Sequence, residues 1–424
     1  MAISFKGGVR AGARRDKTVN CESKPVNSCR TLVFCLKGRN GVTYIPEVKA
    51  GDEVKAGQRI AYSADSWELP LHSSASGRID TVSEDRITLI NNELYETVEA
   101  AAPNANDEKA LILALQNSGI ADMDGGEFIC GDTLAGTPPK YLIVDAMQSE
   151  QYASSLCRRA AEDPREVIKG VRTIQKLFKA RSVYICVSEN ARESEEAIRG
   201  EIRYDESINI LMMKYKYPQQ DKSVLVRSVT GRELSTAMQE GCIVTNAEIM
   251  YNVCRTVEKG LPVTERIVTV GGSAVLEPDN FRVPFGVPVS FMIKEAKGYI
   301  DPPERIVING LMSGYEVKED DVLDKNSVSI QAMLTEKQRR RTGSCIRCGR
   351  CAAACPEGLL PYKLNASSVD FKVDTAIRYD IFRCSSCGVC TNVCPAGLNI
   401  SENIEDMTLL IKRIRGMEAE TENE

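Results

Sequence analysis

Two copies of one cysteine pattern, close together in the last fifth of the chain, constrain its fold more than any other feature. Each copy reads C-x2-C-x2-C-x3-C and is followed at once by proline. The first copy comprises Cys345, Cys348, Cys351 and Cys355, and the second comprises Cys384, Cys387, Cys390 and Cys394. The two-residue gaps let three thiolates of one copy reach three irons of a cubane. The longer gap and the proline turn the fourth cysteine toward the other cluster.

The spacing therefore predicts two [4Fe-4S] clusters, each held by three cysteines of one copy and the last cysteine of the other. The expected metal ligands are Cys345, Cys348 and Cys351 with Cys394, and Cys384, Cys387 and Cys390 with Cys355. Zinc ribbons pair C-x2-C units but lack the third cysteine and the proline, so a zinc-held interaction module is a minor alternative. We assign no residue to catalysis and none to binding another cofactor.

The rest of the chain offers few other ligands or acid–base groups. His72 is the one histidine in the sequence, which argues against Cys/His zinc sites and histidine-based catalysis. The other eight of the sixteen cysteines are scattered, as buried thiols are in a reducing compartment: Cys21, Cys29, Cys35, Cys130, Cys157, Cys186, Cys242 and Cys254.

Charge and hydropathy argue against two broad classes of function. The formal net charge is -5 and the pI is near 5.5, whereas a nucleic-acid-binding protein normally presents a basic face. The sequence has no apolar run of about eighteen residues, and no apolar segment follows the basic start "MAISFKGGVRAGARRD". We therefore expect no nucleic-acid partner, no transmembrane segment and no secretion signal. We expect a cytoplasmic protein that reaches a membrane face only through partner subunits.

Hydrophobic patterning indicates an α/β multidomain chain, for which 424 residues are ample. Short alternating strands with Gly-rich turns come first, and "EVKAGDEVKAGQ" resembles the lipoyl or biotinyl carrier fold. The turn "HSSASG" lacks the lysine that such carriers modify, so we interpret this part as a structural module. Buried strands then alternate with helices, which predicts a mostly parallel sheet, and Gly260 is expected to cap the last of these helices.

The expected domains follow from these changes of pattern. They are an N-terminal extension (1–30), a β barrel-sandwich module (31–100), a βαβ Rossmann-like domain (108–260), a small β-grasp domain (262–325), a helical two-cluster ferredoxin-type domain (335–415) and an acidic tail (416–424).

Five arginines lie just before and within the first cysteine copy: Arg339, Arg340, Arg341, Arg347 and Arg350. A basic collar in an acidic protein is typical of a surface that steers an acidic electron carrier. A merely solvated face is the alternative.

The order of these parts resembles RnfC, the peripheral NADH-facing subunit of the Rnf electron-transport complex, over roughly residues 30 to 400. The resemblance is strongest in "VKAGDEVKAGQ", "HSSASGRI", "KYPQQDKSVLV", "GLPVTERIVTVGGSAV" and the paired cysteine motifs. It implies a middle domain of the complex I flavoprotein-subunit type and a β-grasp domain of the SLBB type. It also implies partners such as ferredoxin, a flavoprotein or other Rnf-type subunits.

Relatives of this type hold FMN and NADH on a loop resembling G-x-G-G-x-G-F-P and a segment resembling N-A-A-E-C-E-P-Y. These motifs fall here on "GIADMDGGEF" and "VDAMQSEQY", where Gly125, Phe128, Glu150 and Tyr152 persist. Three loop positions have become acidic: Asp122, Asp124 and Glu127. The second motif departs at Asp145, Gln148, Ser149 and Gln151, and the histidines usual near the family's N-terminus are absent.

These departures argue against ordinary FMN binding. Side chains added where backbone must touch phosphate block its approach, and carboxylates repel it. One charge pair about 4 Å apart contributes roughly 4 kcal/mol at an effective dielectric of about 20, which is about a thousandfold in affinity. We interpret the loop as one that keeps the family's turn and has lost its phosphate ligand. The alternative is a functional loop in which a metal or another ligand offsets the carboxylates.

The sequence thus predicts an electron-transfer protein of RnfC type that passes single electrons through two [4Fe-4S] clusters between protein partners. Such a protein is a subunit of an oxidoreductase complex rather than a stand-alone enzyme. The alternative is an NADH-oxidising, FMN-containing subunit of an Rnf-type complex linked to ferredoxin.

Overall fold

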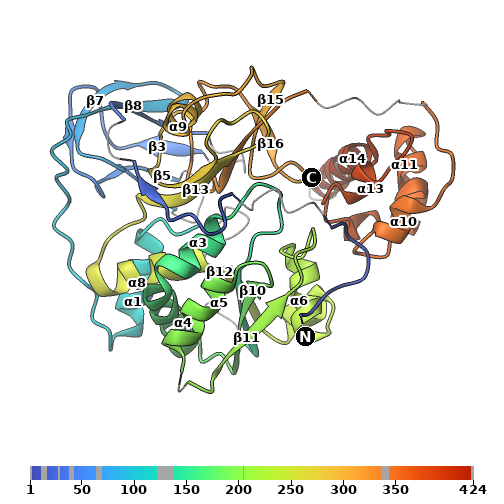
Figure 1. Ribbon diagram of the computed structural model, residues 1–424, viewed down its shortest axis with the longest axis horizontal. Coiled ribbons are helices and arrows are strands. Elements are labelled where there is room, and N and C mark those ends of the chain that lie inside the picture. Colours follow the sequence, from blue (N-terminus) through green and yellow to red (C-terminus); the bar gives the residue numbers. More distant parts are fainter. Residues whose placement is uncertain are drawn as a thin grey trace.

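The computed structural model describes residues 2–10, 17–26, 29–37, 43–63, 69–121, 138–203, 205–335 and 343–421, and side chains as far as 416. A small β module and a β-rich domain lie together at one end of the molecule, and an α/β domain lies beneath them (Figure 1). A helical domain, drawn in orange and red, stands to one side (Figure 1). The predicted fold class, α/β multidomain with these four kinds of part, is confirmed.

The N-terminal module is built from two small antiparallel sheets. Its strands alternate buried and exposed residues, which leaves Leu32, Phe34, Ile87 and Leu89 facing a shared interior. The first sheet has the order β2 (Thr31–Cys35), β8 (Arg86–Asn91), β7 (Gly77–Val82), β4 (Glu53–Val54), and the second β3 (Tyr44–Pro46), β5 (Arg59–Ser63), β6 (Leu71–His72).

The α/β domain has a parallel sheet in the order β11 (Ile208–Met213), β10 (Ser182–Ser188), β9 (Tyr141–Ala146), β12 (Cys242–Asn246). In this order the chain reverses direction across the sheet between β9 and β12, which is where Rossmann-like sheets bind ligands. Its helices are α1 (Glu108–Asn117), α3 (Ser155–Glu162), α4 (Pro164–Phe178), α5 (Arg192–Glu201), α6 (Lys222–Thr230), α7 (Leu234–Gln239) and α8 (Ala247–Lys259).

Local capping explains where several of these helices start and stop. The Asn246 side chain accepts a hydrogen bond from the Ile249 N–H and begins α8, and Asp221 caps α6 in the same way. Gly260 ends α8 with a φ of 66°, in the left-handed region, so the expected C-cap is confirmed.

The β-rich domain is a mixed sheet crossed by one short helix, as expected for a β-grasp fold. Its order is β1 (Lys24–Pro25), β14 (Asp279–Pro284), β13 (Glu265–Gly271), β17 (Ser329–Met333), β15 (Arg305–Ile308), β16 (Tyr315–Val317), with α9 (Val289–Glu295) between β14 and β15 in the chain. Strand β17 pairs parallel to β13 and antiparallel to β15. The sheet therefore extends beyond residue 325, where the sequence analysis ends the domain, and takes β1 from the N-terminal extension.

The C-terminal domain is helical and has its own core. It contains α10 (Arg350–Ala354), α11 (Pro361–Val369), α12 (Val373–Arg378), the 3-10 turn η1 (Ile381–Arg383), α13 (Val389–Asn392) and α14 (Ile400–Thr421). Helix α14 continues into the segment expected to be an acidic tail, and its residues Ile404, Met407 and Ile411 are buried against α11. Across the described ranges, no helix combines the length and the apolar character needed to span a bilayer.

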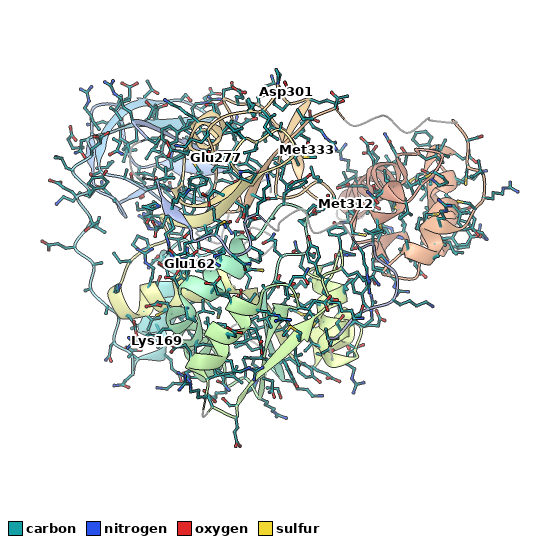
Figure 2. All side chains as sticks on the ribbon, viewed as in Figure 1. Glu162, Lys169, Glu277, Asp301, Met312 and Met333 are labelled. Atoms are coloured by element: carbon teal, nitrogen blue, oxygen red, sulfur yellow. The ribbon has the colours of Figure 1, made fainter. Side chains whose placement is uncertain are left out.

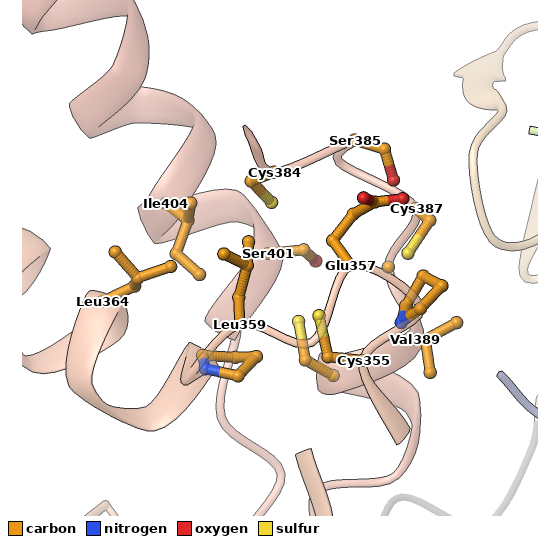
Figure 3. A pocket seen from close by; sticks show the side chains of 14 residues that line it. Cys355, Glu357, Leu359, Leu364, Cys384, Ser385, Cys387, Val389, Ser401 and Ile404 are labelled. Carbon is orange, nitrogen blue, oxygen red and sulfur yellow. The ribbon is translucent and has the colours of Figure 1, made fainter. Parts of the chain in front are cut away.

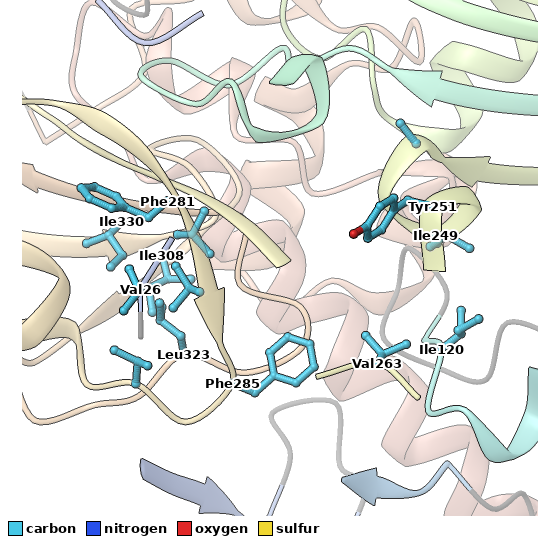
Figure 4. Packing of buried hydrophobic residues seen from close by; sticks show 14 of the residues in the cluster. Val26, Ile120, Ile249, Tyr251, Val263, Phe281, Phe285, Ile308, Leu323 and Ile330 are labelled. Carbon is cyan, nitrogen blue, oxygen red and sulfur yellow. The ribbon is translucent and has the colours of Figure 1, made fainter. Parts of the chain in front are cut away.

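The other three parts share one continuous hydrophobic core. Figure 4 shows Phe281, Ile308 and Ile330 of the β-grasp sheet on one side and Ile249 and Tyr251 of α8 on the other. Polar contacts join the same parts, because Arg282 of β14 binds both Glu162 and Asp163 at 2.9 Å. Glu162 is labelled at this junction in Figure 2. These domains are therefore packed as one body, to which the C-terminal domain is attached.

A buried carboxyl group forms another link between the domains. Glu150, fully buried beyond β9, accepts hydrogen bonds from the Ser313 N–H (3.1 Å) and hydroxyl (2.8 Å). Its carboxyl group lies so close to Gly310 that a Cβ there would be 2.2 Å from it. Burial raises the pKa of Glu150 to about 7, although hydrogen bonds from Ser313 and from the Met312 backbone oppose the rise. Burial likewise raises the pKa of Asp145 to about 7.

These raised values predict a pH dependence of stability. A carboxyl group with a higher pKa in the folded state than in the unfolded state binds its proton more tightly when folded. The contribution of Glu150 to the free energy of unfolding should therefore be largest below about pH 4.5. It should fall as the pH rises from there through 7. Glu150→Gln keeps the acceptor but cannot ionise, so it should remove up to about 3 kcal/mol of that fall.

The measurement is the unfolding midpoint of the cluster-loaded protein at pH 5 and pH 7.5 under anaerobic conditions. Glu304→Gln, at an exposed position before β15, is the matched control and should follow the wild type. A Glu150→Gln curve parallel to the wild type would show that Glu150 is not the titrating group.

Candidate functional site: two cysteine pockets

Four cysteines line what we call the first cysteine pocket: Cys345, Cys348, Cys351 and Cys394. Three come from the first motif and one from the end of the second. Tyr362 of α11 and Ile400 at the start of α14 contribute to its wall, and about 310 Å³ inside it is not filled by atoms. The structure therefore brings together the four residues of the first predicted set.

The second cysteine pocket is lined by Cys355, Cys384, Cys387 and Cys390. Figure 3 shows it from close by, with Leu359, Leu364 and Ile404 forming an apolar wall. About 380 Å³ inside it is free of atoms. The four residues of the second predicted set are thus also brought together, and each motif places its last cysteine in the pocket of the other.

The same backbone turn builds both pockets. The residue before the second cysteine has a positive φ in each motif, 56° at Arg347 and 51° at Ser386. The residue after that cysteine is a glycine in the left-handed region, Gly349 at 74° and Gly388 at 73°, and it begins α10 or α13. A left-handed residue at this point turns the chain back on itself, so that the helix carries the third cysteine to the pocket.

Burial makes these thiols poor anions on their own. It raises the pKa of Cys387 to about 11 and that of Cys390 to about 12. A thiolate in such surroundings needs a positively charged centre beside it, which iron supplies. Over the described part of the chain, no three His, Cys, Asp or Glu side chains are grouped to hold a single metal ion. Four sulfurs around each cavity fit a cubane cluster in donor type and number.

Contacts fix the second pocket to the body of the protein. The Tyr217 hydroxyl donates to the Cys387 carbonyl at 2.8 Å, and a Cβ on Gly388 would lie 2.7 Å from the Met312 carbonyl oxygen. Figure 2 labels Met312 beside the C-terminal domain. Glu357, which lines the pocket, accepts from the Ser223 hydroxyl at 2.6 Å and pairs with Arg227 at 3.1 Å.

Sequence reasoning missed Tyr217, Glu357 and Arg227. Their partners are more than one hundred residues away in the chain, so no local pattern marks them. Of the five collar arginines, Arg347 and Arg350 are exposed, and the other three lie outside the described residues.

The proposed flavin loop can be assessed only in part. Asp122, Asp124, Gly125, Glu127 and Phe128 lie outside the described residues. In the second motif, Glu150 and Tyr152 are buried, and the Glu150 carboxyl group is turned toward Ser313. Glu150 therefore serves as a link between domains in this structure.

A further pocket, of about 490 Å³, lies at the carboxyl end of β12, between the α/β and β-grasp domains. It contains Asn246, Glu248 and two cations, Arg266 and Lys325. The buried Arg266 Nε has no hydrogen-bond partner among the described residues, and burial lowers the pKa of Lys325 to about 7. Buried cations with incomplete hydrogen bonding suit a small anionic group.

Three protein families match successive parts of the chain. Residues 3–100 match the RnfC barrel sandwich hybrid domain, residues 115–255 the Nuo51 FMN-binding domain, and residues 344–398 the 4Fe-4S dicluster domain. The last match confirms two [4Fe-4S] clusters as the cofactors of the C-terminal domain.

Curated relatives match nearly the full length. A subunit of the proton-translocating ferredoxin:NAD(+) oxidoreductase complex of Clostridium ljungdahlii is 27% identical over 389 residues, 86% of this chain and 84% of that protein. A subunit of the Na(+)-translocating ferredoxin:NAD(+) oxidoreductase complex of Acetobacterium woodii is 25% identical, over 85% of this chain and 86% of that protein.

Among solved structures, a chain of the NAD+-reducing [NiFe]-hydrogenase in the H2-reduced state aligns with a TM-score of 0.49 and 14% identity. The alignment covers 72% of this chain and 61% of the hydrogenase chain. The domain order and the curated relatives confirm the resemblance inferred from the motifs: the chain is similar to RnfC-type subunits over most of its length, and its C-terminal part matches a [4Fe-4S] dicluster domain.

Proposed function

We propose that this chain is an electron-transfer subunit of RnfC type, which passes single electrons through two [4Fe-4S] clusters between protein partners. The observation that carries the proposal is the pair of pockets, each lined by four cysteines drawn from both motifs. Each bound cluster supplies a centre that gains and loses one electron. The protein's own residues hold the thiolates in place and keep the second pocket apolar.

The proposed ligands are Cys345, Cys348, Cys351 and Cys394 for the first cluster and Cys384, Cys387, Cys390 and Cys355 for the second. Because each motif contributes to both clusters, the two centres lie in one small helical domain. No acid–base residue is required in this function, which suits a subunit of an oxidoreductase complex rather than a stand-alone enzyme.

The relatives suggest where such a subunit acts. Their names describe subunits of ferredoxin:NAD(+) oxidoreductase complexes. We infer redox partner proteins for this chain, such as ferredoxin, a flavoprotein or other Rnf-type subunits. We also infer a cytoplasmic location, with attachment to the membrane face through those subunits.

Substitution of the last cysteine of each motif tests which cluster that cysteine binds. In a Cys345→Ala/Cys348→Ala background, which should lose the first cluster, the remaining cluster should depend on Cys355 and not on Cys394. Adding Cys355→Ala should abolish the remaining EPR signal after dithionite reduction, and adding Cys394→Ala should retain most of it. Cys35→Ala, outside both motifs, is the control and should retain both clusters.

The reverse pattern, with the remaining cluster lost in the Cys394 variant alone, would mean that each motif holds its own cluster. If the wild-type protein contains iron but its EPR spectrum does not change on reduction, the electron-transfer function itself is contradicted.

A second candidate function is oxidation of NADH through bound FMN. It is favoured by the match of residues 115–255 to an FMN-binding domain and by the Arg266–Lys325 pocket, whose cations suit a phosphate group. If the acidic loop has lost its ligand, as we infer, the oxidised protein should show the broad iron–sulfur absorbance without flavin bands. NADH should then leave the spectrum unchanged. Flavin bands that NADH bleaches would establish the second function instead.

A further inference from the structure

The two cysteine pockets face different surroundings. The second pocket is held against the body of the protein by Tyr217, by Glu357 and by the close approach of Gly388 to Met312. In the first pocket Cys345 and Cys348 are exposed, and Ile346 between them is 59% exposed. The C-terminal domain therefore has an inner end, at the second pocket, and an outer end, at the first.

The N-terminal segment, residues 2–10, lies against the C-terminal domain at the end of α10. It pairs with the edge of the α/β sheet where Ile3 bridges Met213, and then reaches the first motif, where the Gly8 N–H donates to the Ala354 carbonyl at 2.7 Å. Figure 1 shows this blue segment beside the C-terminal domain. A Cβ on Gly7 would be 2.6 Å from the Cys355 carbonyl oxygen, so only glycine allows this approach.

An open groove lies between this segment and both cysteine motifs. Gly7 and Gly8 form one wall, Arg350 and Ala354 another, and Asn392 and Pro395 a third. About 1180 Å³ of space is not filled by atoms, part of it open to solvent. The groove thus gives a partner access to the backbone on which both sets of ligands are carried.

The charged residues of the segments around this groove are all positive. The segments 2–10, 343–354 and 388–396 contain Lys6, Arg10, Arg347 and Arg350 and no Asp or Glu, although the whole chain has a net charge of -5. All four cations are exposed, and none forms an ion pair with another described residue. Nearby, the pKa of Lys216 is lowered by burial and by the charges of Arg10 and Lys214.

We propose that the surface formed by Lys6, Arg10, Ile346, Arg347 and Arg350 docks an acidic one-electron carrier protein, which exchanges electrons with the first cysteine pocket. The inference rests on the proposed electron-transfer function and names the partner and its point of entry. In each encounter one electron moves: the carrier is oxidised by one electron and this protein is reduced by one, or the reverse. No bond between them forms or breaks.

The arrangement suits a brief encounter between proteins. An exposed apolar side chain beside exposed cations, as Ile346 is beside Arg347, resembles the centre and rim of a small interface. Charges of one sign steer an oppositely charged partner and raise its association rate, with little effect on the chemistry that follows. Weak redox encounters use interfaces at the small end of the range, so a few residues suffice.

The test uses full-length, cluster-loaded protein and a reduced acidic two-[4Fe-4S] ferredoxin as the probe, in anaerobic stopped flow. Lys6→Glu/Arg10→Glu should lower the second-order rate constant at low salt by about tenfold or more, and Lys6→Gln/Arg10→Gln should lower it by a smaller factor. The difference should shrink as salt rises. Lys49→Glu/Arg78→Glu makes the same charge change at exposed positions of the N-terminal module and should leave the rate within about twofold.

Iron content and the dithionite-reduced EPR signal identify which idea fails. Suppose that iron content and the EPR signal remain normal. If Lys6→Glu/Arg10→Glu and Lys49→Glu/Arg78→Glu then lower the rate constant equally, or neither lowers it, the docking surface is wrong and the electron-transfer function stands. If the wild type has no reducible clusters, the function itself fails. If Lys6→Glu/Arg10→Glu instead abolishes pelleting with anionic phospholipid vesicles and leaves the ferredoxin rate unchanged, the surface binds a membrane and the proposal is overturned.

Discussion

The sulfur of Cys355 lies in the pocket of the second motif, and the sulfur of Cys394 lies in the pocket of the first. Much else in the C-terminal domain follows from this exchange. The 28 residues between the two motifs must leave one pocket and return to the other, and they do so as α11, α12 and η1. Helix α14 then closes both, with Ile400 at the first pocket and Ile404 at the second. The domain's core is small, so bound clusters are a major part of what stabilises it.

Contacts at the second pocket fix the C-terminal domain to the body of the protein. Hydrogen bonds from Tyr217 and to Glu357 fix the second pocket against α6 and the loop before it, and the Gly388–Met312 contact fixes it against the β-grasp domain. The polar groups in these contacts are neutral or paired, and they are part-buried. Removing one partner would leave the other group without its hydrogen bond, which costs stability. At the first pocket, Cys345 and Cys348 are exposed. The asymmetry follows from the packing of the domain and is independent of the identity of any partner.

The sequence predicted the features whose cause is local. Cysteine spacing, the helix cap at Gly260 and the strand–helix alternation all act within a few residues. The structure extends the β-grasp sheet past residue 325, because β17 follows β16 after a loop and joins the sheet only by pairing with β13 and β15. The link between Glu150 and Ser313 spans 163 residues, so sequence reasoning saw only a family motif there. The same holds for Arg266 and Lys325, whose pocket forms only when the domains pack.

Iron and acid-labile sulfide content of anaerobically purified protein tests the central claim most directly, because everything above depends on eight sulfurs holding two cubes of iron and sulfide. The account predicts about eight iron atoms and about eight sulfides per chain, with negligible zinc. About two zinc ions with no labile sulfide would contradict it and would make the C-terminal domain a zinc-held interaction module.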